Sequence, residues 1–509
     1  MKLLERIAAK VGFVRSQPRA AAPMRRQYAG AQVSRLTEDW AGAFSSADTE
    51  SSSSGQRLRA RARQLERDNP FVERYLKLLC NNVLGSTGIG LQMKVRDPDR
   101  MDGGKIKRGS YDTLANATIE SAWYDWARGR NCCVDGHTGL GEIEKLALRS
   151  AARDGSMFIL LHEGAGKYGL QLECFEADFL REDYNEALPN GNVVRFGVEM
   201  TAQRKPVAYH FFNRHPHDTG SVSGGLRAVR VPAERVIHVC RRNRQGQTNG
   251  VSWLAPVMMR LKMLDGYEEA ELIAARCAAS KMGFYVKTMP ADYQGEMDNA
   301  GNPTQEMQPG VIEDLPMGTT FQTLDPQHPV AAYADFVKAA LRGVSSGIGV
   351  SYNSLASDLE GVNYSSIRAG LLEEREEWKG IQNWFIETVR TVIFEKWLAM
   401  ALLSGELKLP NGSALPAAKF DKFNSPEWKP RRWQWVDVYK DAMANVMLIE
   451  KGLSSRRQII AENGGDVEDT FADLSADEDL AENYGLKFPK DVQENPVAAA
   501  NAAAQDDQE

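Results

Sequence analysis

The feature that most constrains the fold is a long helical pattern from Ser366 to Ser404. Its apolar side chains recur in steps of three, four and seven residues, at Ile367, Leu371, Trp378, Ile381, Phe385, Val389 and Val392. At about 1.5 Å per residue, such a helix would be roughly 55–60 Å long. That length indicates a large core or an assembly and argues against a small compact domain.

A shorter helix and a polar loop precede this pattern. The helix is predicted from Val330 to Val344, with Pro329 suited to its first turn. The loop that follows, GIGVSYNSLASDLEGVNYSS, is punctuated by glycines and flanked by helices on both sides. We therefore expect it to project into a space such as a channel or the groove of a partner.

The remaining chain predicts an α+β fold. Helical patterns fall in five further stretches: 57–83, 111–129, 140–154, 252–283 and 437–484. The first of them is expected to break at Asn69-Pro70, because a residue before proline avoids helical geometry. Residues 156–239 read as strands with glycine-rich turns, and 284–327 as a loop-rich insert.

Composition fits an ordinary soluble globular protein. It argues against a basic nucleic-acid-binding protein, a membrane-spanning protein and a cysteine metal site. The net charge is −6, whereas a protein that binds nucleic acid freely is usually basic. No stretch approaches the length of a membrane span. The six cysteines contain no C-x-x-C pair, so we expect reduced thiols and no structural metal. We predict no cofactor.

Candidate chemical motifs fail on inspection. HEGAGKYG has Tyr168 where a phosphate-binding loop needs Ser or Thr, and we expect a hairpin turn there. His215-Pro-His217 could supply two metal ligands, but no third ligand stands at an obvious spacing, so a surface loop is expected. We predict that the protein is not an enzyme.

Two further sets of side chains have a structural and a functional interpretation. The arginines Arg57, Arg59, Arg61, Arg63 and Arg67 could contact phosphate, but a solvated helix face or a subunit contact is preferred. The tryptophans could stack on bases, but their spacing favours packing: Trp378, Trp384, Trp397, Trp428, Trp433 and Trp435.

Three segments together resemble the lambda-type family of tailed-bacteriophage portal proteins. They are residues 58–92, 309–378 and 428–460, and they occur in the order of the family. The resemblance covers most of residues 57–487. It implies a ring, usually of twelve subunits, at one capsid vertex, through which double-stranded DNA passes during packaging and ejection.

The resemblance also implies a division of the chain. A disordered basic N-terminal arm (1–56) leads into an α+β wing (57–251). A stem helix (252–283), a small clip insert (284–327) and a stem return helix (328–349) follow. The later parts are a tunnel loop (350–365), a long wing helix with wing return (366–436), a helical crown (437–490) and a disordered acidic tail (491–509).

The tunnel loop is then the expected DNA-facing segment. Its polar and charged candidates, with two cations of the return helix, are Lys338, Arg342, Ser351, Tyr352, Asn353, Ser354, Asp358, Glu360, Asn363 and Tyr364. A sparse set of cations suits a channel, because dense Lys and Arg would grip every phosphate. A salt bridge to a neighbouring subunit is an equal alternative for Lys338 and Arg342.

The expected partners follow from the same resemblance. They are further copies of the chain, the terminase large subunit, head-tail connector proteins, and the major capsid and scaffold proteins, with no membrane. The protein is expected in the virion, after assembly in the host cytoplasm. Two other functions stay open: a nucleic-acid-processing packaging enzyme, and a structural capsid protein without a channel.

Overall fold

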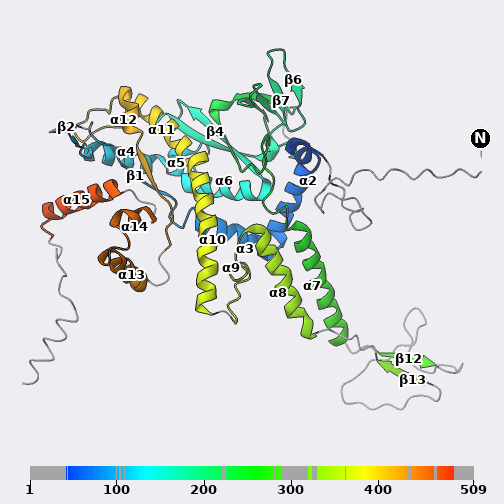
Figure 1. The fold of residues 1–509 in the computed structure, drawn as a ribbon. Coiled ribbons are helices and arrows are strands. Elements are labelled where there is room, and N and C mark those ends of the chain that lie inside the picture. Colours follow the sequence, from blue (N-terminus) through cyan, green and yellow to red (C-terminus); the bar gives the residue numbers. More distant parts are fainter. Residues whose placement is uncertain are drawn as a thin grey trace, which may run out of the picture.

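The structure is a computed structural model of the chain. It describes residues 42, 44–98, 100–102, 105–107, 109–218, 225–279, 283–287, 319–323, 330–361, 363–433, 438–462 and 467–486. A mixed body of helices and sheets carries a pair of projecting helices, a long helix and a separate C-terminal group of helices (Figure 1). The α+β class is confirmed.

Helices α2 (Ala47–Asp68) and α3 (Pro70–Val83) open the described chain. The predicted break between them is confirmed, and Asn69 explains it. Its side-chain oxygen accepts hydrogen bonds from the backbone N–H groups of Phe71 and Val72, while Pro70 occupies the first position of α3. The apolar face of α3 is buried in the main core.

The first ten residues of helix α2, 47–56, fall within the predicted disordered arm, so that part of the prediction is wrong. Ser46 caps the helix by accepting from the N–H of Thr49, and the carboxylates of Asp48 and Glu50 lie in its first turn. Asp48 is buried and accepts from the backbone N–H of Thr248. The serine-rich composition hid this anchoring. Residues 1–41 lie outside the described residues.

Three helices and two antiparallel sheets complete the body. The helices are α4 (Thr113–Trp126), α5 (Gly129–Cys132) and α6 (Leu140–Asp154). One sheet has the order β11-β4-β5, with strands Val236–Cys240, Ser156–Glu163 and Leu170–Glu176. The predicted hairpin at HEGAGKYG is therefore confirmed, because this segment joins β4 to β5.

The second sheet has the order β10-β9-β8-β7-β6. Its strands are Ala228–Pro232, Pro206–Phe212, Val198–Met200, Val193–Arg195 and Glu186–Ala187. The run VVRFGVEM forms two strands, because Phe196 and Gly197 both take positive φ and turn the chain. Short pairs join β1 (Gly90–Met93) to β14 (Pro426–Lys429), and β2 (Arg100–Asp102) to β3 (Lys105–Lys107).

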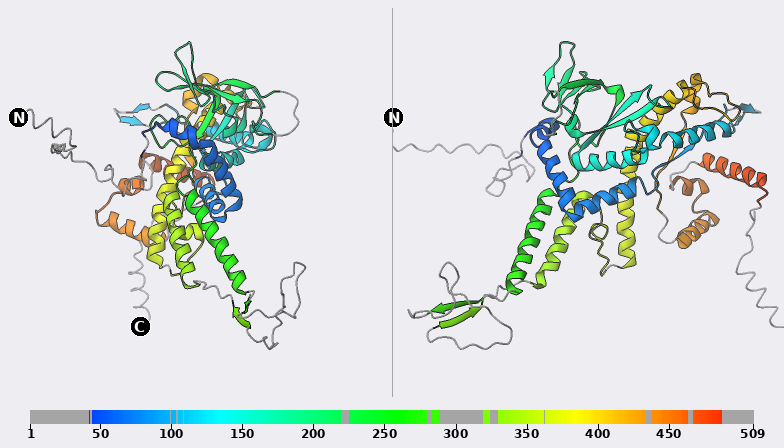
Figure 2. Two further views of the ribbon diagram at one scale, coloured as in Figure 1. Left: turned by 90° about the vertical axis from the view of Figure 1, so that its right-hand side faces the viewer. Right: turned by 180° about the vertical axis from the view of Figure 1, so that it is seen from behind.

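Helices α7 (Met258–Ala279) and α8 (Val330–Ile348) project together from the body (Figure 2). Helix α7 starts six residues later than predicted, since residues around Pro256 form turns instead. The ring of Tyr267 on α7 lies 6.0 Å from that of Tyr333 and 4.6 Å from that of Phe336 on α8. Gly347 lets α8 pack closely against Val257, which immediately precedes α7, because a Cβ at position 347 would lie 2.5 Å from Val257 Cγ1.

Two antiparallel strands, β12 (Gly283–Lys287) and β13 (Thr319–Thr323), lie at the far end of this helix pair (Figure 1). They are the described part of the insert predicted over 284–327. Residues 288–318 and 324–329 lie outside the described residues. The short helix α9 (Tyr352–Ala356) follows α8 within the segment that was predicted to be a loop.

The predicted long helix is confirmed. It runs through α10 (Tyr364–Phe385), a π-helical turn (Ile386–Arg390) and α11 (Thr391–Leu403). Buried apolar residues along its second half recur in steps of four: Phe385, Val389, Ile393, Trp397 and Ala401. Residues four apart do not stay on one face of an ideal α-helix, because it has 3.6 residues per turn. The π turn has more residues per turn and so returns these side chains to one face.

The main core joins α3, α4, α6, the sheet of β4 and the long helix. Trp123, Trp126 and Trp397 pack there with ring centroids about 5–6 Å apart. Trp378 is buried too, and Trp384, Trp428 and Trp433 pack against this core, as predicted. A smaller core around Phe158 and Phe211 lies between the two sheets.

The chain ends in what we name the C-terminal helical cluster, residues 438–486. It contains α13 (Val438–Glu450), α14 (Arg456–Glu462) and α15 (Val467–Asn483). Asp473 on α15 ties it to the body through Lys94 Nζ at 3.2 Å and the hydroxyl of Tyr111 at 3.0 Å. Within the described ranges, no helix is both long and apolar enough to cross a bilayer.

Candidate functional site

The segment between α8 and α10 has an anchored base. Ser351 caps α9 by accepting a hydrogen bond from the N–H of Ser354. Leu355 is 2% exposed and packs into the main core. The guanidinium of Arg74 on α3 donates to the carbonyl of Ser354 at 3.2 Å. These contacts fix residues 351–356 to the body.

Glu374 on α10 strengthens the same base. Its Oε2 accepts from the hydroxyl of Ser354 at 2.8 Å and from the N–H of Ser351 at 3.2 Å. Its Oε1 accepts from the indole N–H of Trp378 at 3.2 Å. Glu374 is 7% exposed, so a buried carboxylate joins the start of α9 to the long helix.

The tip of the segment, residues 357–361, is exposed by contrast. Leu359 is 68% exposed, although it is a large apolar residue. The carboxylate of Glu360 is 83% exposed. Ser357 begins the tip with a φ of 54°, which ends α9 in the left-handed conformation. The tip therefore presents one apolar and one acidic side chain outward.

Asp358 connects this tip to its surroundings. It accepts from the Tyr352 hydroxyl at 2.8 Å and from the N–H of Glu360 at 2.9 Å. Those two hydrogen bonds, the backbone one first, hold the pKa of Asp358 below its usual value. Burial and the bond to Asp358 raise the pKa of Tyr352. The carboxylate of Asp358 thus connects Tyr352 in the base to Glu360 in the tip through hydrogen bonds.

The two predicted cations of α8 take part in this segment. Lys338 Nζ lies 3.7 Å from Asp358 Oδ2 and 3.5 Å from Glu360 Oε2. The guanidinium of Arg342 lies 5.6 Å from the ring centre of Tyr352. Lys338 therefore forms ion pairs within its own chain, with the acids of the tip. Arg342 lies beside Tyr352 in the same segment.

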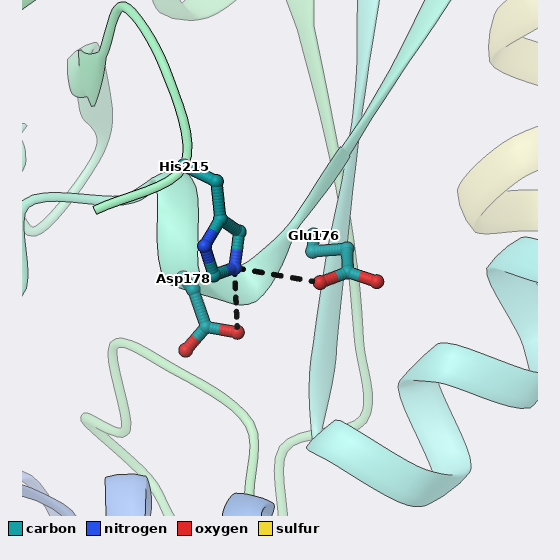
Figure 3. Close-up of side chains that lie close together, drawn as sticks. All are labelled: Glu176, Asp178 and His215. Carbon is teal, nitrogen blue, oxygen red and sulfur yellow. Dashed lines mark ion pairs between the residues drawn. The ribbon is translucent and has the colours of Figure 1, made fainter. Parts of the chain in front are cut away.

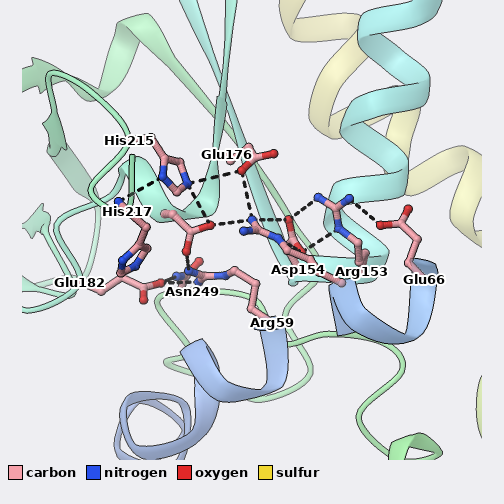
Figure 4. A network of polar contacts seen from close by, with 11 residues as sticks. Arg59, Glu66, Arg153, Asp154, Glu176, Glu182, His215, His217 and Asn249 are labelled. Atoms are coloured by element: carbon pink, nitrogen blue, oxygen red, sulfur yellow. Dashed lines mark hydrogen bonds and ion pairs between the residues drawn. The ribbon is translucent and has the colours of Figure 1, made fainter. Parts of the chain in front are cut away.

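A second polar constellation lies where α2 meets the sheets (Figure 4). The buried guanidinium of Arg59 pairs with Asp178 at 2.8 Å and Glu182 at 2.7 Å. Arg63 pairs with Asp154 at 2.9 Å and Asp178 at 2.6 Å. Burial opposes the charge of Asp178, but the two arginines outweigh it and lower its pKa.

Neither interpretation of the arginine run holds for these two residues. The side chain of Arg59 is 4% exposed and that of Arg63 is 29% exposed, and both pair with carboxylates of their own chain. Arg57 and Arg61, on the other side of the helix, are exposed as expected. The partners lie 91 to 123 residues away in sequence, so no local pattern reveals them.

His215 belongs to the one group of described side chains with metal-ligand character (Figure 3). Its Nε2 lies 3.7 Å from Glu176 Oε2 and 3.8 Å from Asp178 Oδ2. The sequence offered no third ligand for His215-Pro-His217, but the fold brings two carboxylates to it. Arg63 already lies 3.3 Å from Glu176 and compensates both acids, so the group requires no metal ion.

Comparison with known families decides the identity. The family described as phage portal protein, lambda family, matches residues 33–382, which is more than half of the chain. The chain belongs to the lambda family of phage portal proteins. The sequence resemblance is therefore confirmed.

Two individual portal proteins are similar in sequence. The chain is 32% identical over 505 residues to a probable portal protein of Halomonas phage phiHAP-1, covering 97% of this chain and 95% of the relative. It is 22% identical over 477 residues to portal protein B of Escherichia phage lambda, covering 84% and 85%. A solved neck of a native gene transfer agent particle is similar with a TM-score of 0.41 and 13% identity, covering 79% and 93%.

Within this portal protein, the predicted site residues divide into three groups. The first group takes part in the contacts above: Ser351 with Ser354, and Tyr352, Asp358, Glu360 and Lys338 with one another, with Arg342 beside the Tyr352 ring. Asn363 instead caps α10, accepting from the N–H of Ser366 at 2.8 Å. Tyr364 lies in the first turn of α10, and Asn353 is half-buried in α9. Sequence reasoning missed Glu374 and Arg74, which hold the base.

Proposed function

We propose that copies of this chain close into a ring, twelve in number as the family resemblance implies, and that DNA passes through its bore. In this arrangement the exposed tip at residues 357–361 faces the bore, and the base holds it there. The observation that carries the proposal is this contrast between an anchored base and an exposed tip beside α8.

The charges around the tip suit passage of DNA without capture. Lys338 is paired with Asp358 and Glu360, so its attraction to phosphate is reduced. The two acids of the tip offset the two cations Lys338 and Arg342, and a sliding duplex then gains little counterion-release affinity. Ser351, Tyr352, Asn353, Ser354, Asn363 and Tyr364 supply the polar surroundings in this proposal.

The projecting pair α7–α8 supports ring formation. Met259, Met263 and Ile273 on α7 are 66%, 71% and 52% exposed, respectively. They follow helical spacing along one face, and a large exposed apolar face marks a protein contact. We propose that this face is covered by a neighbouring subunit of the stem. A head-to-tail contact of this kind closes into a ring.

The remaining assignments follow the family resemblance. We propose that the body is the wing, that α7 and α8 are the stem, and that β12 and β13 belong to the clip. The clip end is where we place the terminase large subunit and later the head-tail connector proteins. Major capsid and scaffold proteins contact the outer body. The protein acts in the virion vertex without catalysing a reaction.

Electron cryomicroscopy of the purified full-length chain tests the proposal. A ring with a central hole, with residues 357–361 on its inner wall, is the expected result. Sedimentation at micromolar concentration should show a large closed particle. A monomer alone, a particle without a bore, or the tip on the outer rim would overturn the proposal.

A further inference from the structure

We infer that the acidic tail of this chain, residues 487–509, docks as a helix in a groove beside helix α4 of its own body. This inference goes beyond the ring proposed above, because it concerns a contact within one subunit. An empty groove and a tail supplied by a neighbouring copy are separate outcomes of the tests below.

The groove is a hollow of about 760 Å³ along one face of α4. Leu114 and Tyr124 line it and are 58% and 51% exposed, although both are large apolar residues. Between them lie the small side chains of Ala117 and Ser121, which are exposed as well. Residues 406–410 complete the lining. The groove therefore offers apolar surface to a partner whose own side chains are small enough to approach it.

Positive charge exceeds negative charge at one end of this groove. Asp125 Oδ2 lies 3.0 Å from Lys167 Nζ, and Asp125 Oδ1 lies 3.5 Å from the guanidinium of Arg128 and 3.9 Å from that of Arg130. The side chains of these three cations are 50%, 64% and 68% exposed. One carboxylate does not offset three cations, so this end of the groove favours a partner with negative charge.

The tail starts near the other end of α4. Asp473 on α15 accepts from the hydroxyl of Tyr111, two residues before α4 begins at Thr113. Helices α4 and α15 lie on the same side of the molecule in Figure 1 and in the right-hand view of Figure 2. Helix α15 runs ten residues beyond Asp473, about 15 Å, to Asn483. Residues 487–496 can extend over roughly 33 Å, so the tail reaches the groove from there.

The sequence of the tail predicts a helix that suits the groove. Asn495 is a favourable N-cap, and Pro496 suits the first helical position. The eight residues from Val497 to Ala504 comprise six alanines, one valine and one asparagine. Alanine has the highest helix propensity, and its short side chain permits close approach to Ala117 and Ser121. A segment predicted to be disordered when free can fold when it docks.

The acids of the tail match the cations of the groove in position. Asp506 lies nine residues after Val497, about 14 Å along a helix, and Asp125 lies eleven residues after Leu114, about 17 Å. A tail helix parallel to α4, with Val497 beside Leu114, therefore brings its acids to the cationic end. Acids at a helix C-terminus oppose the helix dipole and weaken the free helix, and cations there compensate them.

Photo-cross-linking of the full-length chain tests the position of the tail. A benzophenone amino acid at position 500 should cross-link to residues 114–124 or 406–410, as identified by mass spectrometry. In an equal mixture of isotopically light and heavy chains, these cross-links should join residues of one chain. Cross-links between light and heavy chains, or cross-links confined to other parts of the body, would overturn the inference.

Hydrogen exchange tests whether the groove is what folds the tail. We expect residues 497–504 to exchange about tenfold more slowly in the wild-type chain than in Ala117→Trp, which fills the groove at an exposed position. Ala60→Trp makes the same change at an exposed position of α2 and should leave the protection unchanged. Equal exchange in the two variants, or wild-type exchange as fast as that of a free peptide, would overturn the inference.

A charge exchange tests the pairing of acids with cations. Lys167→Glu alone, or Asp506→Lys with Asp507→Lys, should reduce the protection of residues 497–504, and the three changes together should restore it. Protection that is unchanged by either reversal would overturn the charge pairing. All of these measurements read contacts within one subunit. A chain that forms no ring would therefore overturn the proposed function and leave this inference standing.

Discussion

Arg390 and Glu144 form an ion pair inside the body. Arg390, in the π-helical turn, donates from Nη1 to both carboxylate oxygens of Glu144 on α6, at 2.6 Å each. The two residues are 4% and 1% exposed. The guanidinium also lies 4.9 Å from the ring centre of Trp428. The pair thus joins the long helix to the helices of the body.

Removing one member of this pair should be costly. Arg390→Met leaves Glu144 buried without a counter-charge, and we expect the free energy of unfolding to fall by about 3–5 kcal/mol. Urea unfolding of the full-length chain at fixed concentration measures it. The double variant with Glu144→Leu should recover most of the loss, since neither charge then remains buried.

A half-exposed ion pair provides the matched control. Lys396 on α11 lies 2.9 Å from Glu163, and the two side chains are 35% and 34% exposed. Lys396→Met should change stability by about 0–1 kcal/mol. A loss below about 1 kcal/mol for Arg390→Met as well would show that the pair does not connect the elements energetically.

Glu374 should control the base of the proposed tunnel loop. Glu374→Ala leaves the donors of Ser351 and Ser354 without their buried acceptor, at a cost of about 1–3 kcal/mol. Amide exchange of residues 351–356 should then be roughly 5- to 150-fold faster. Glu373→Ala, on the exposed side of α10, is the control. Equal exchange in both variants would contradict this account.

His238 should make stability depend on pH. Burial, with the nearby charge of Arg242, lowers the pKa of His238 to about 3. Below pH 6.5 the unfolded chain binds a proton at this residue and the folded chain does not, so stability falls as pH falls. The expected contribution is about 1.4 kcal/mol per pH unit, continuing until the pH nears the folded pKa.

The window between pH 6.5 and 5 separates this effect from most carboxylates, which titrate below it. Burial also lowers the pKa of His210, so that residue adds to the slope in the same direction. His238→Gln should flatten the dependence of unfolding free energy on pH in that window. His137→Gln, at an exposed position, should leave the wild-type slope in place. An unchanged slope in His238→Gln would mean that this imidazole becomes charged in the folded protein.

If the tip at residues 357–361 faces DNA, reversing a charge there should change the affinity of the ring for duplex DNA. Glu360→Lys removes an acid that offsets Lys338 and adds a cation, and ring particles should then bind duplex DNA more tightly. The slope of log affinity against log salt should steepen by about 0.9 for each phosphate contacted. Fluorescence anisotropy at several salt concentrations measures both quantities.

A charge change elsewhere tests whether the effect is local. Asp183→Lys alters an exposed acid on the body, 67% exposed, and changes the net charge by the same amount. We expect little change in DNA affinity from it. Equal tightening in the two variants would indicate a general charge effect and would count against a bore-facing tip.

The helices were the most predictable part of the fold. The spacing of apolar residues in the long helix and the Asn69-Pro70 break reflect local physics, and the structure follows them. The start of α2 was missed, although Ser46 followed by Asp48 and Glu50 is a recognisable capping pattern. The serine-rich run outweighed that signal.

Contacts between distant segments were not predictable. Arg59 meets Asp178, Arg390 meets Glu144, and His215 meets Glu176 only because sheets and helices bring them together. A single sequence contains no local sign of these partners. Glu374 stands in a run of acidic residues that looks like a solvated helix face, yet it is a buried structural acceptor.

The π-helical turn between α10 and α11 sets which side chains of the two helices lie on the same face. A turn with one surplus residue rotates everything beyond it by about 100° relative to an uninterrupted helix. Helix α10, which borders the tip, and helix α11, which packs among tryptophans, are thus one continuous helix. The turn decides which side chains of α11 face the same way as those of α10. A further residue gained at Ile386–Arg390 would turn one end of the helix against the other, whereas the loss of one residue would convert the turn into ordinary α-helix.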